Sequence, residues 1–378
     1  MKYFIIAGEQ SGDLHGSNLV EELFRCDKLA EIECWGGDLM ESAGATLVMH
    51  YRNTAFMGFV GVLKNLGAIK RNFTICKQQI SEFKPDVVIL IDYPGFNFRI
   101  AEFAKKSGLR VFYYISPKLW AWKEGRVRRV RKYVDRMYII FPFEVDFYRK
   151  HNIEVEYRGN PLLDETEKKL KAFPSGDDIR KSLGLGNKPV IALLAGSRKS
   201  EVRDILPEML KAVYHFPDHQ FVLAGVKNLP DELYHSILSD YPVILIKDKT
   251  YEILYVSEAA LVKSGTATLE TALFTIPQVV CFKADLISMI IGWIVIRVKF
   301  ISLVNLIAGY EAVKELIQYS LNEKNLVSEL KAILPGGSKR EKILEDYNKV
   351  RKILGPAGAS ERVAEDMVKM LRREGHKA

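Results

Sequence analysis

The chain has 378 residues, 48% of them hydrophobic and 27% charged, a composition that excludes an intrinsically disordered protein and allows two domains. The net charge of +8 favours an anionic partner, such as a phosphorylated substrate or an anionic lipid surface. We expect no nucleic acid partner, because neither zinc-finger spacing nor an aromatic pattern for single strands is present. Four scattered cysteines without a C-x-x-C pair are typical of reduced thiols in a cytoplasmic protein.

Strands and helices alternate along the whole chain. Apolar runs typical of buried strands occupy residues 2–7, 86–91, 111–115, 137–141, 189–195, 221–225, 243–247, 259–262 and 278–282. Helical spacing follows most of them, which predicts an α/β fold with parallel sheets and right-handed crossovers. A charged stretch at 164–188 is interpreted as a linker with a short helix. We therefore expect two Rossmann-like domains facing a cleft, at 1–165 and 166–340, and C-terminal helices at 341–378 that pack back on the first domain.

The first strand leads into a glycine-rich turn that carries Glu9, Ser11 and Asp13. The turn does not match the G-x-G-x-x-G dinucleotide motif. Ser11 or Asp13 is suited to cap the helix that follows. Because the two carboxylates repel a pyrophosphate, we interpret this turn as one for sugar hydroxyls.

Asp92 directly follows the strand at 86–91 and precedes a Pro-Gly turn. Open α/β sheets bind ligands beyond the carboxyl ends of their strands, so this carboxylate is a candidate for chemistry. The alternative is an ordinary turn aspartate.

A stiff loop with Trp120 and Trp122 follows the strand at 111–115, and a basic segment comes after it. These cations form either an anion-binding surface or one solvated helix face. They are Lys123, Arg126, Arg128, Arg129, Arg131, Lys132 and Arg136.

Two apolar stretches, residues 57–63 and 286–296, have basic neighbours and are candidates for contact with anionic lipid. The second is too short to cross a bilayer, which needs about 20 residues. The alternatives are buried helices or, for the second stretch, a dimer contact. The residues in these stretches that we assign to the membrane or the acceptor are Met57, Phe59, Val60 and Trp293. Elsewhere in the chain we assign Ser11, Trp120, Trp122 and Arg126 to the same role.

Two turns in the second half are candidates for phosphate binding. Gly196, Ser197 and Arg198 follow the strand at 189–195 and precede a helix, where free backbone N–H groups favour an anion. An arginine at this place suits a phosphate group. The alternative is a basic surface turn.

Ser264, Gly265 and Thr266 form the second of these turns, between the strand at 259–262 and a helix. Glu270 is expected in the first turn of that helix, within reach of a ribose hydroxyl. A glycine-rich turn without a ligand is the alternative. The sequence has no H-E-x-x-H, Walker A or Asp-x-Asp motif, so we expect neither a metal nor a cofactor.

Taken together, these stretches resemble the lipid-A-disaccharide synthase family over nearly the whole chain. The motifs that carry the resemblance are GEQSGDLHG (8–16), MGFVGVL (57–63), KPDVVILIDYPGFN (84–97), YYISPKLWAWKEGRV (113–127), FPFE (141–144), GSRKSEV (196–202), KSGTATLE (263–270) and SLVNLIAG (302–309). Their order and spacing match the family, and the combination is far more specific than any one motif.

The resemblance implies an inverting glycosyltransferase of the GT-B type that needs no metal. The implied donor is UDP-2,3-diacylglucosamine and the implied acceptor is 2,3-diacylglucosamine 1-phosphate (lipid X), giving a β-1,6-linked disaccharide 1-phosphate and UDP. The first domain then faces the acceptor and the membrane, and the second binds the UDP-sugar. A cytoplasmic protein bound peripherally to the cytoplasmic leaflet of the inner membrane is also implied, and the long C-terminal helices leave room for a homodimer.

The acceptor 6-hydroxyl must lose a proton as it attacks the anomeric carbon, so a general base is needed. Asp92 is our candidate, because it lies at a strand end and matches the aspartate that the family is thought to use. Glu9 and Asp13 are the alternatives.

The departing UDP builds negative charge, which Arg198 and the helix start after Ser264, Gly265 and Thr266 are suited to stabilise. Glu270 is expected to hold the ribose. By resemblance, Asn305 matches a polar position that faces the donor. The basic residues near 123–132 are expected to meet the acceptor phosphate or the membrane.

Four positions depart from the family pattern: Gly61 replaces a glutamate, Asn160 a histidine, Val304 a proline and Tyr310 an arginine. The lost charges at Gly61 and Tyr310 leave open a non-catalytic UDP-sugar-binding relative. The two-domain fold leaves open an isomerase like UDP-N-acetylglucosamine 2-epimerase. The absence of a convincing acid–base histidine cluster counts against the isomerase, and the candidate base and phosphate arginine count against the non-catalytic relative.

Overall fold

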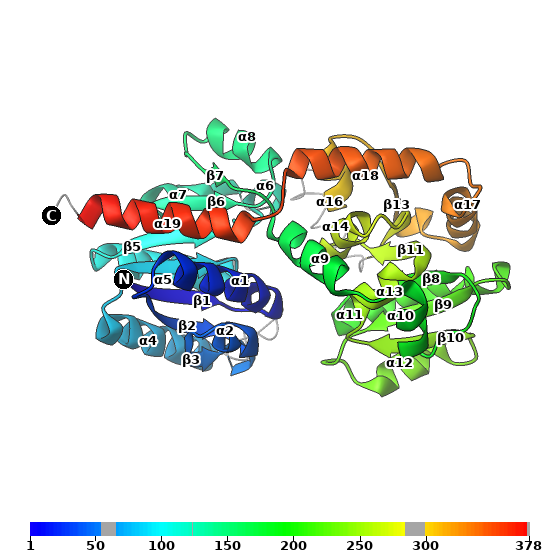
Figure 1. Ribbon diagram of the computed structural model, residues 1–378, viewed down its shortest axis with the longest axis horizontal. Coiled ribbons are helices and arrows are strands. Elements are labelled where there is room, and N and C mark those ends of the chain that lie inside the picture. Colours follow the sequence, from blue (N-terminus) through cyan, green and yellow to red (C-terminus); the bar gives the residue numbers. More distant parts are fainter. Residues whose placement is uncertain (54–65, 123, 284–298, 376–378) are drawn as a thin grey trace. The chain divides into compact units, whose positions relative to one another are not determined.

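The computed structural model describes residues 1–53, 66–122, 124–283 and 299–375. It divides into two compact units, Met1–Asp164 with Pro356–Ala378, and Glu165–Gly355. Each unit contains one parallel sheet with helices on both faces (Figure 1). The predicted α/β class with two Rossmann-like domains is confirmed.

The sheet of the first unit has seven strands in the order β3-β2-β1-β4-β5-β6-β7. Its central strand β4 reads Val-Val-Ile-Leu-Ile, and all five residues are buried, as expected for a parallel sheet covered on both faces. The strands are β1 (Lys2–Ala7), β2 (Glu31–Gly36), β3 (Thr46–His50), β4 (Val87–Ile91), β5 (Arg110–Tyr114), β6 (Arg136–Ile139) and β7 (Glu156–Tyr157).

The α-helices described in the first unit are α1 (Gln10–Cys26), α2 (Asp38–Ser42), α4 (Leu66–Phe83), α5 (Pro94–Lys106), α6 (Leu119–Trp122), α7 (Val127–Tyr133), α8 (Phe143–Lys150) and α19 (Ala359–Gly375). The last of these lies along α1 (Figure 1). Its start is capped by the carboxylate of Asp164, which accepts hydrogen bonds from the backbone N–H groups of Gly358, Ala359 and Ser360.

The sheet of the second unit has six parallel strands in the order β10-β9-β8-β11-β12-β13. They are β8 (Val190–Leu194), β9 (Gln220–Gly225), β10 (Val243–Lys247), β11 (Ser257–Lys263), β12 (Gln278–Phe282) and β13 (Lys314–Ile317). The α-helices described here are α10 (Gly176–Ser182), α11 (Lys199–Leu210), α12 (Asp231–Leu238), α13 (Thr250–Tyr255), α14 (Thr266–Leu273), α16 (Leu303–Ala308), α17 (Glu323–Ile333) and α18 (Arg340–Leu354).

The connection between the units is helical rather than a linker. Within 164–188, α9 (Pro161–Ala172) runs from the first unit into the second and α10 follows it. The expected C-terminal segment, 341–378, is divided: α18 packs within the second unit and α19 within the first. Tyr347 fixes α18 by donating a hydrogen bond to the carbonyl oxygen of Ile276 at 3.1 Å. None of the described helices is both long enough and apolar enough to cross a bilayer.

Candidate active site

The strand order reverses once in each sheet, and such switch points are where open α/β sheets bind ligands. In the first unit, the reversal lies between β1, which is followed by Glu9, and β4, which is followed by Asp92. In the second unit, it lies between β8, which Gly196 follows closely, and β11, which Ser264 follows. Each set of candidate residues therefore lies at the switch point of its own sheet.

The backbone beyond β4 and β5 is strained. Asp92 and Tyr93 have φ angles of 42° and 48°, and Ile115 has a φ of 62°. The left-handed region is costly for residues with a β-carbon, most of all for a β-branched one. Strain of this kind gathers at functional sites, which supports a functional role for this edge of the sheet.

Buried polar groups hold Asp92 in this conformation. The side-chain amide of Asn97 donates to two backbone carbonyl oxygens, that of Asp92 among them at 2.8 Å. The Tyr113 hydroxyl donates to the same carbonyl of Asp92. On the neighbouring strand end, a β-carbon at Gly8 would lie 2.3 Å from the Tyr93 ring, so only glycine fits there.

The carboxyl group of Asp92 has a higher pKa than an ordinary aspartate. Burial raises its pKa to about 6, and the negative charge of Glu9 adds to the rise. The positive charge of Lys118 and the backbone N–H of Tyr93 oppose it. At neutral pH the group is mostly ionised yet more basic than an ordinary aspartate, which suits a general base.

Asp13 has a different role from the one considered in the sequence. It is 2% exposed, and its carboxylate accepts backbone hydrogen bonds from Gly37, Leu39 and Met40 at 2.7, 3.2 and 3.1 Å. These are the N–H groups at the start of α2, whose N-cap is the glycine. Asp13 therefore caps α2 and does not present a free base.

The other two residues of this turn lie at the start of α1. Glu9 is the N-cap residue and is partly buried, and Ser11 is exposed in the first turn. Neither side chain caps the helix. Glu9 stays the alternative base, because its charge acts on Asp92.

Trp120 is tied to a buried glutamate. Its indole N–H donates to Glu144 Oε1 at 3.2 Å, and two backbone N–H groups donate to Oε2. Burial raises the pKa of Glu144 to about 7. The Ser116 and Tyr148 hydroxyls, 2.7 Å apart, fix the same loop. This network sets the course of the loop that carries Lys118.

Arg126 is partly buried, and burial and the charge of Arg129 lower its pKa from the usual range. It has no acidic partner among the residues that the structure describes. Trp122 ends α6. The remaining residues assigned to acceptor or membrane lie outside the described residues: Met57, Phe59, Val60 and Trp293.

The turn after β8 is organised by Glu201, a residue that the sequence did not point to. Its Oε2 accepts hydrogen bonds from the backbone N–H groups of Ser197 and Arg198 at 3.1 and 3.3 Å. Its Oε1 accepts one from Lys263 Nζ at 2.8 Å. A β-carbon at Gly196 would lie 2.5 Å from Oε2, so the glycine makes room for the carboxylate.

The hydrogen bonds to Glu201 change which groups the turn at 196–198 can present to an anion. The backbone N–H groups of Ser197 and Arg198 are taken by Glu201. The exposed Arg198 side chain pairs with Glu201 Oε1 at 3.5 Å through one nitrogen, and its guanidinium has further N–H groups for an anion. Lys263 adds a second cation at the end of β11. The acid at the third position of α11 is a capping-box signal that the sequence contained.

The second turn leads directly into α14. Ser264 donates its hydroxyl to the carbonyl of Ile301 at 2.8 Å, Gly265 is the N-cap and the exposed Thr266 is the first helical residue. Because α14 starts at Thr266, Glu270 lies in the second turn rather than the first. Glu270 accepts a hydrogen bond from the Tyr251 hydroxyl at 2.8 Å.

Asn305 is completely buried and fully hydrogen-bonded. Its Oδ1 accepts from the backbone N–H groups of Ala312 and Val313, and its Nδ2 donates to the Val313 carbonyl and to Glu315. These four bonds use the whole capacity of an asparagine side chain. Asn305 therefore holds the 312–315 segment, which differs from the expected contact with the donor.

Three of the four departures from the family pattern can be placed. Asn160 is buried and caps α9 by accepting the backbone N–H of Leu162 at 2.9 Å. Val304 is buried in α16, and the Tyr310 hydroxyl donates to Asp346 at 2.8 Å. Gly61 lies outside the described residues.

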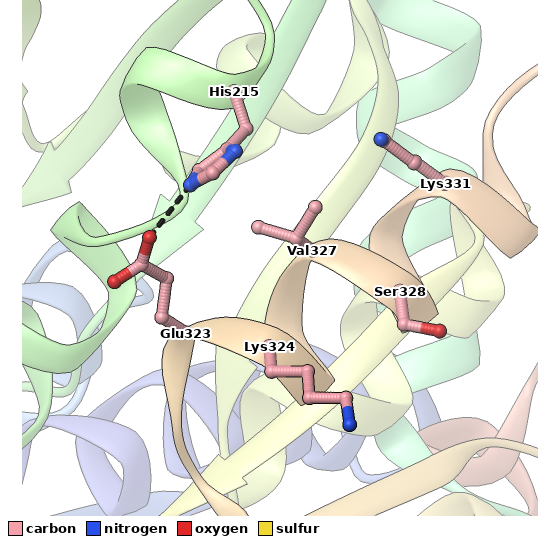
Figure 2. A pocket seen from close by; sticks show the side chains of 6 residues that line it. All are labelled: His215, Glu323, Lys324, Val327, Ser328 and Lys331. Atoms are coloured by element: carbon pink, nitrogen blue, oxygen red, sulfur yellow. Dashed lines mark hydrogen bonds and ion pairs between the residues drawn. The ribbon is translucent and has the colours of Figure 1, made fainter.

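A pocket of about 620 Å³ lies in the second unit (Figure 2). It is lined by His215, Glu323, Lys324, Val327, Ser328 and Lys331, and none of these belongs to the candidate site. His215 and Glu323 are paired across it at 2.7 Å. In the described ranges, no group of three His, Cys, Asp or Glu side chains is arranged for a metal ion.

Two parallel α/β units, each with a switch point, are the architecture of the GT-B fold class. A solved structure supports this fold: the UDP-GlcNAc 2-epimerase of Neisseria meningitidis, bound to UDP-GlcNAc, superposes with a TM-score of 0.71. The alignment covers 98% of this chain and 100% of that one at 14% identity, so it carries the fold alone.

The sequence comparisons identify the family. The family described as Lipid-A-disaccharide synthetase matches residues 3–366. A lipid-A-disaccharide synthase of Geobacter metallireducens is 37% identical over 377 residues, covering 98% of this chain and 97% of its own. One of Syntrophus aciditrophicus is 40% identical, covering 95% of each chain. The chain belongs to the lipid-A-disaccharide synthetase family and is a glycosyltransferase.

Proposed function

We propose that the protein transfers 2,3-diacylglucosamine from UDP-2,3-diacylglucosamine to the 6-hydroxyl of 2,3-diacylglucosamine 1-phosphate, giving a β-1,6-linked disaccharide 1-phosphate and UDP. Family membership over nearly the whole chain supports these substrates. The observation that carries the chemistry is the partly buried carboxyl group of Asp92 at the switch point of the first sheet, with its pKa raised to about 6.

In the proposed reaction, Asp92 accepts the proton of the acceptor 6-hydroxyl as that oxygen bonds to the anomeric carbon. The bond from this carbon to the diphosphate oxygen breaks, and UDP leaves with the electron pair. Attack from the face opposite UDP inverts the configuration. A base with its pKa close to the working pH accelerates such a step by about 10²- to 10⁴-fold.

We assign the leaving UDP to the second unit. The N–H groups of Gly265 and Thr266 at the start of α14 have no acceptor in the part of the chain that the structure describes, and such groups favour an anion. Arg198 and Lys263 supply positive charge beside them, and Glu270 accepts from the ribose. Ser264 and the turn at 196–198 also belong to this site. Asn305 does not contact the nucleotide, because its hydrogen bonds hold the 312–315 segment.

Arg126 is our candidate for the acceptor phosphate. A partly buried guanidinium without an acidic partner among the described residues is suited to a phosphate, which it can bind through two N–H groups. The exposed cations of α7 extend this basic surface: Arg128, Arg129, Arg131 and Lys132.

Peripheral binding to the cytoplasmic leaflet of the inner membrane is part of the proposal. Each lysine or arginine near an anionic membrane contributes about 1 kcal/mol. Flotation with vesicles that contain anionic lipid measures it, and Arg128→Glu with Lys132→Glu should reduce binding several-fold. Binding that is equal with neutral vesicles would contradict it.

The homodimer stays a prediction. Analytical ultracentrifugation of the purified protein measures its oligomeric state.

The function is tested with purified protein, both substrates in mixed micelles, and mass spectrometry of the products. We expect UDP and the disaccharide 1-phosphate, and neither from an acceptor that lacks the 6-hydroxyl. Epimerisation of the donor without any acceptor would support the isomerase. UDP binding without product would support the non-catalytic relative.

A further inference from the structure

Glu270 is held by a tyrosine from another helix. Tyr251, in α13, donates its hydroxyl to Glu270 Oε1 at 2.8 Å. The Tyr251 ring packs against Phe274, with ring centroids 5.1 Å apart, and against the apolar core of the second unit. Turning the ring away would break both contacts, so Oε1 is occupied.

The other oxygen of this carboxylate is available. Among the residues that the structure describes, no group donates a hydrogen bond to Glu270 Oε2. Burial and the charge of Glu165 raise the pKa of Glu270, and the Tyr251 hydroxyl opposes that rise. The phenol therefore occupies one oxygen and helps to keep the other a charged acceptor.

The occupied oxygen limits how a ribose can bind. The 2′ and 3′ hydroxyls of ribose are adjacent, and a carboxylate with two free oxygens can accept from both. Each carboxylate oxygen has two lone-pair sites, so Oε1 can accept a second hydrogen bond, but a weaker one because it already accepts the Tyr251 hydroxyl. The ribose hydroxyl that faces Oε1 then gains less from Glu270 than the one that faces Oε2.

We propose that Tyr251 is a positioning residue that directs the stronger hydrogen bond of Glu270 to one ribose hydroxyl of the donor nucleotide. The proposal rests on the proposed function, in which the start of α14 binds UDP. It adds a residue that touches no substrate and acts through Glu270. It also makes the recognition of the two hydroxyls unequal.

The test is isothermal titration calorimetry with UDP, 2′-deoxy-UDP and 3′-deoxy-UDP. With the unaltered protein, we expect one deoxynucleotide to bind at least about tenfold more weakly than UDP, because a charged acceptor loses its partner. We expect the other to bind within about threefold of UDP. In Glu270→Gln, the difference between the two analogues should shrink to less than about threefold.

The deciding variant is Tyr251→Phe, which frees Oε1 and keeps the ring. We expect the deoxynucleotide that the unaltered protein tolerates to become at least about threefold weaker than UDP. Tyr347→Phe is the matched control, since this buried tyrosine of the same unit bonds to Ile276 and Gln278 instead. The order of the three nucleotides by affinity should be the same in Tyr347→Phe as in the unaltered protein.

Equal weakening by both analogues in the unaltered protein would overturn the proposal, even if Tyr251→Phe fails to fold. An unchanged ranking in folded Tyr251→Phe would overturn it as well. Both results leave the proposed function intact, because UDP still binds. Failure of the unaltered protein to bind UDP would overturn the proposed function together with this inference.

Discussion

Each switch point carries a carboxylate, and the surroundings shift the pKa values of these two carboxylates in opposite directions. Asp92 has no ion-pair partner among the described residues, and burial raises its pKa to about 6. Burial acts on Glu201 as well, but Lys263, Arg198 and a backbone N–H hold its pKa below the usual range. An unpaired buried carboxylate exchanges a proton near neutral pH, whereas a paired one is a fixed charge. The first unit is thus suited to proton transfer and the second to binding an anion.

The largest expected effect comes from removing the proposed base. Asp92→Asn keeps the shape of the side chain and should lower kcat by about 10²- to 10⁴-fold. The affinity for UDP should stay the same, because the nucleotide is assigned to the other unit. Steady-state kinetics and calorimetry of the same variant check both statements. If Asp92→Asn keeps its activity and Glu9→Gln loses it, the base is Glu9.

A structural carboxylate of the same unit should behave differently. Asp13→Ala leaves three N–H groups of α2 without their acceptor and should lower the free energy of unfolding by about 2 kcal/mol. Activity per folded molecule should change little. Urea denaturation measures the loss, with the exposed Ser11→Ala as the neutral control. A stable but inactive Asp13→Ala would return Asp13 to the catalytic candidates.

The ion pair of the second unit should affect binding and not the proton transfer. Lys263→Met removes a cation beside the proposed phosphate site and leaves Arg198 as the partner of Glu201, so the affinity for UDP should fall about tenfold. Lys211→Met is the matched control, because Lys211 pairs with Glu208 on the same helix, α11, as Glu201. Calorimetry compares the two. Equal affinities would remove Lys263 from the nucleotide site.

Much of the architecture follows from patterns close together in the sequence. The apolar runs and the helices between them predicted the parallel sheets, and Asp92 could be placed at a strand end. The sequence did not reveal which strands are neighbours, so the switch points became visible only in the sheet order. The charged stretch at 164–188 was interpreted as a linker with a short helix because it is polar and carries Pro174, Ser175 and Gly176, whereas α9 alone has 12 residues.

The roles of individual polar residues depend on partners that sequence spacing does not specify. Asp13 lies 24 residues from Gly37, the first of the N–H groups that it caps. Lys263 lies 62 residues from Glu201, and both were missed. Asn305 matched a family position, but its four bonds to the chain became apparent only in the folded structure. Tyr251 was missed for the same reason.

The smallest expected effect gives the most direct test of the charge state of Asp92. Lys118 lowers the pKa of Asp92, so Lys118→Met should raise it further. Because the base acts when ionised, kcat/KM should rise with pH through about 6 in the unaltered protein, and at higher pH in the variant. The expected loss for the variant near pH 6 is roughly twofold.

The measurement is kcat/KM from about pH 5 to about pH 8 for the unaltered protein and Lys118→Met, with the same substrates. The phosphate groups of the substrates titrate equally with both proteins, so a difference between the profiles reports on the enzyme. We expect an acid limb that moves to higher pH in the variant. An acid limb at the same pH in both proteins would contradict Asp92 as the base.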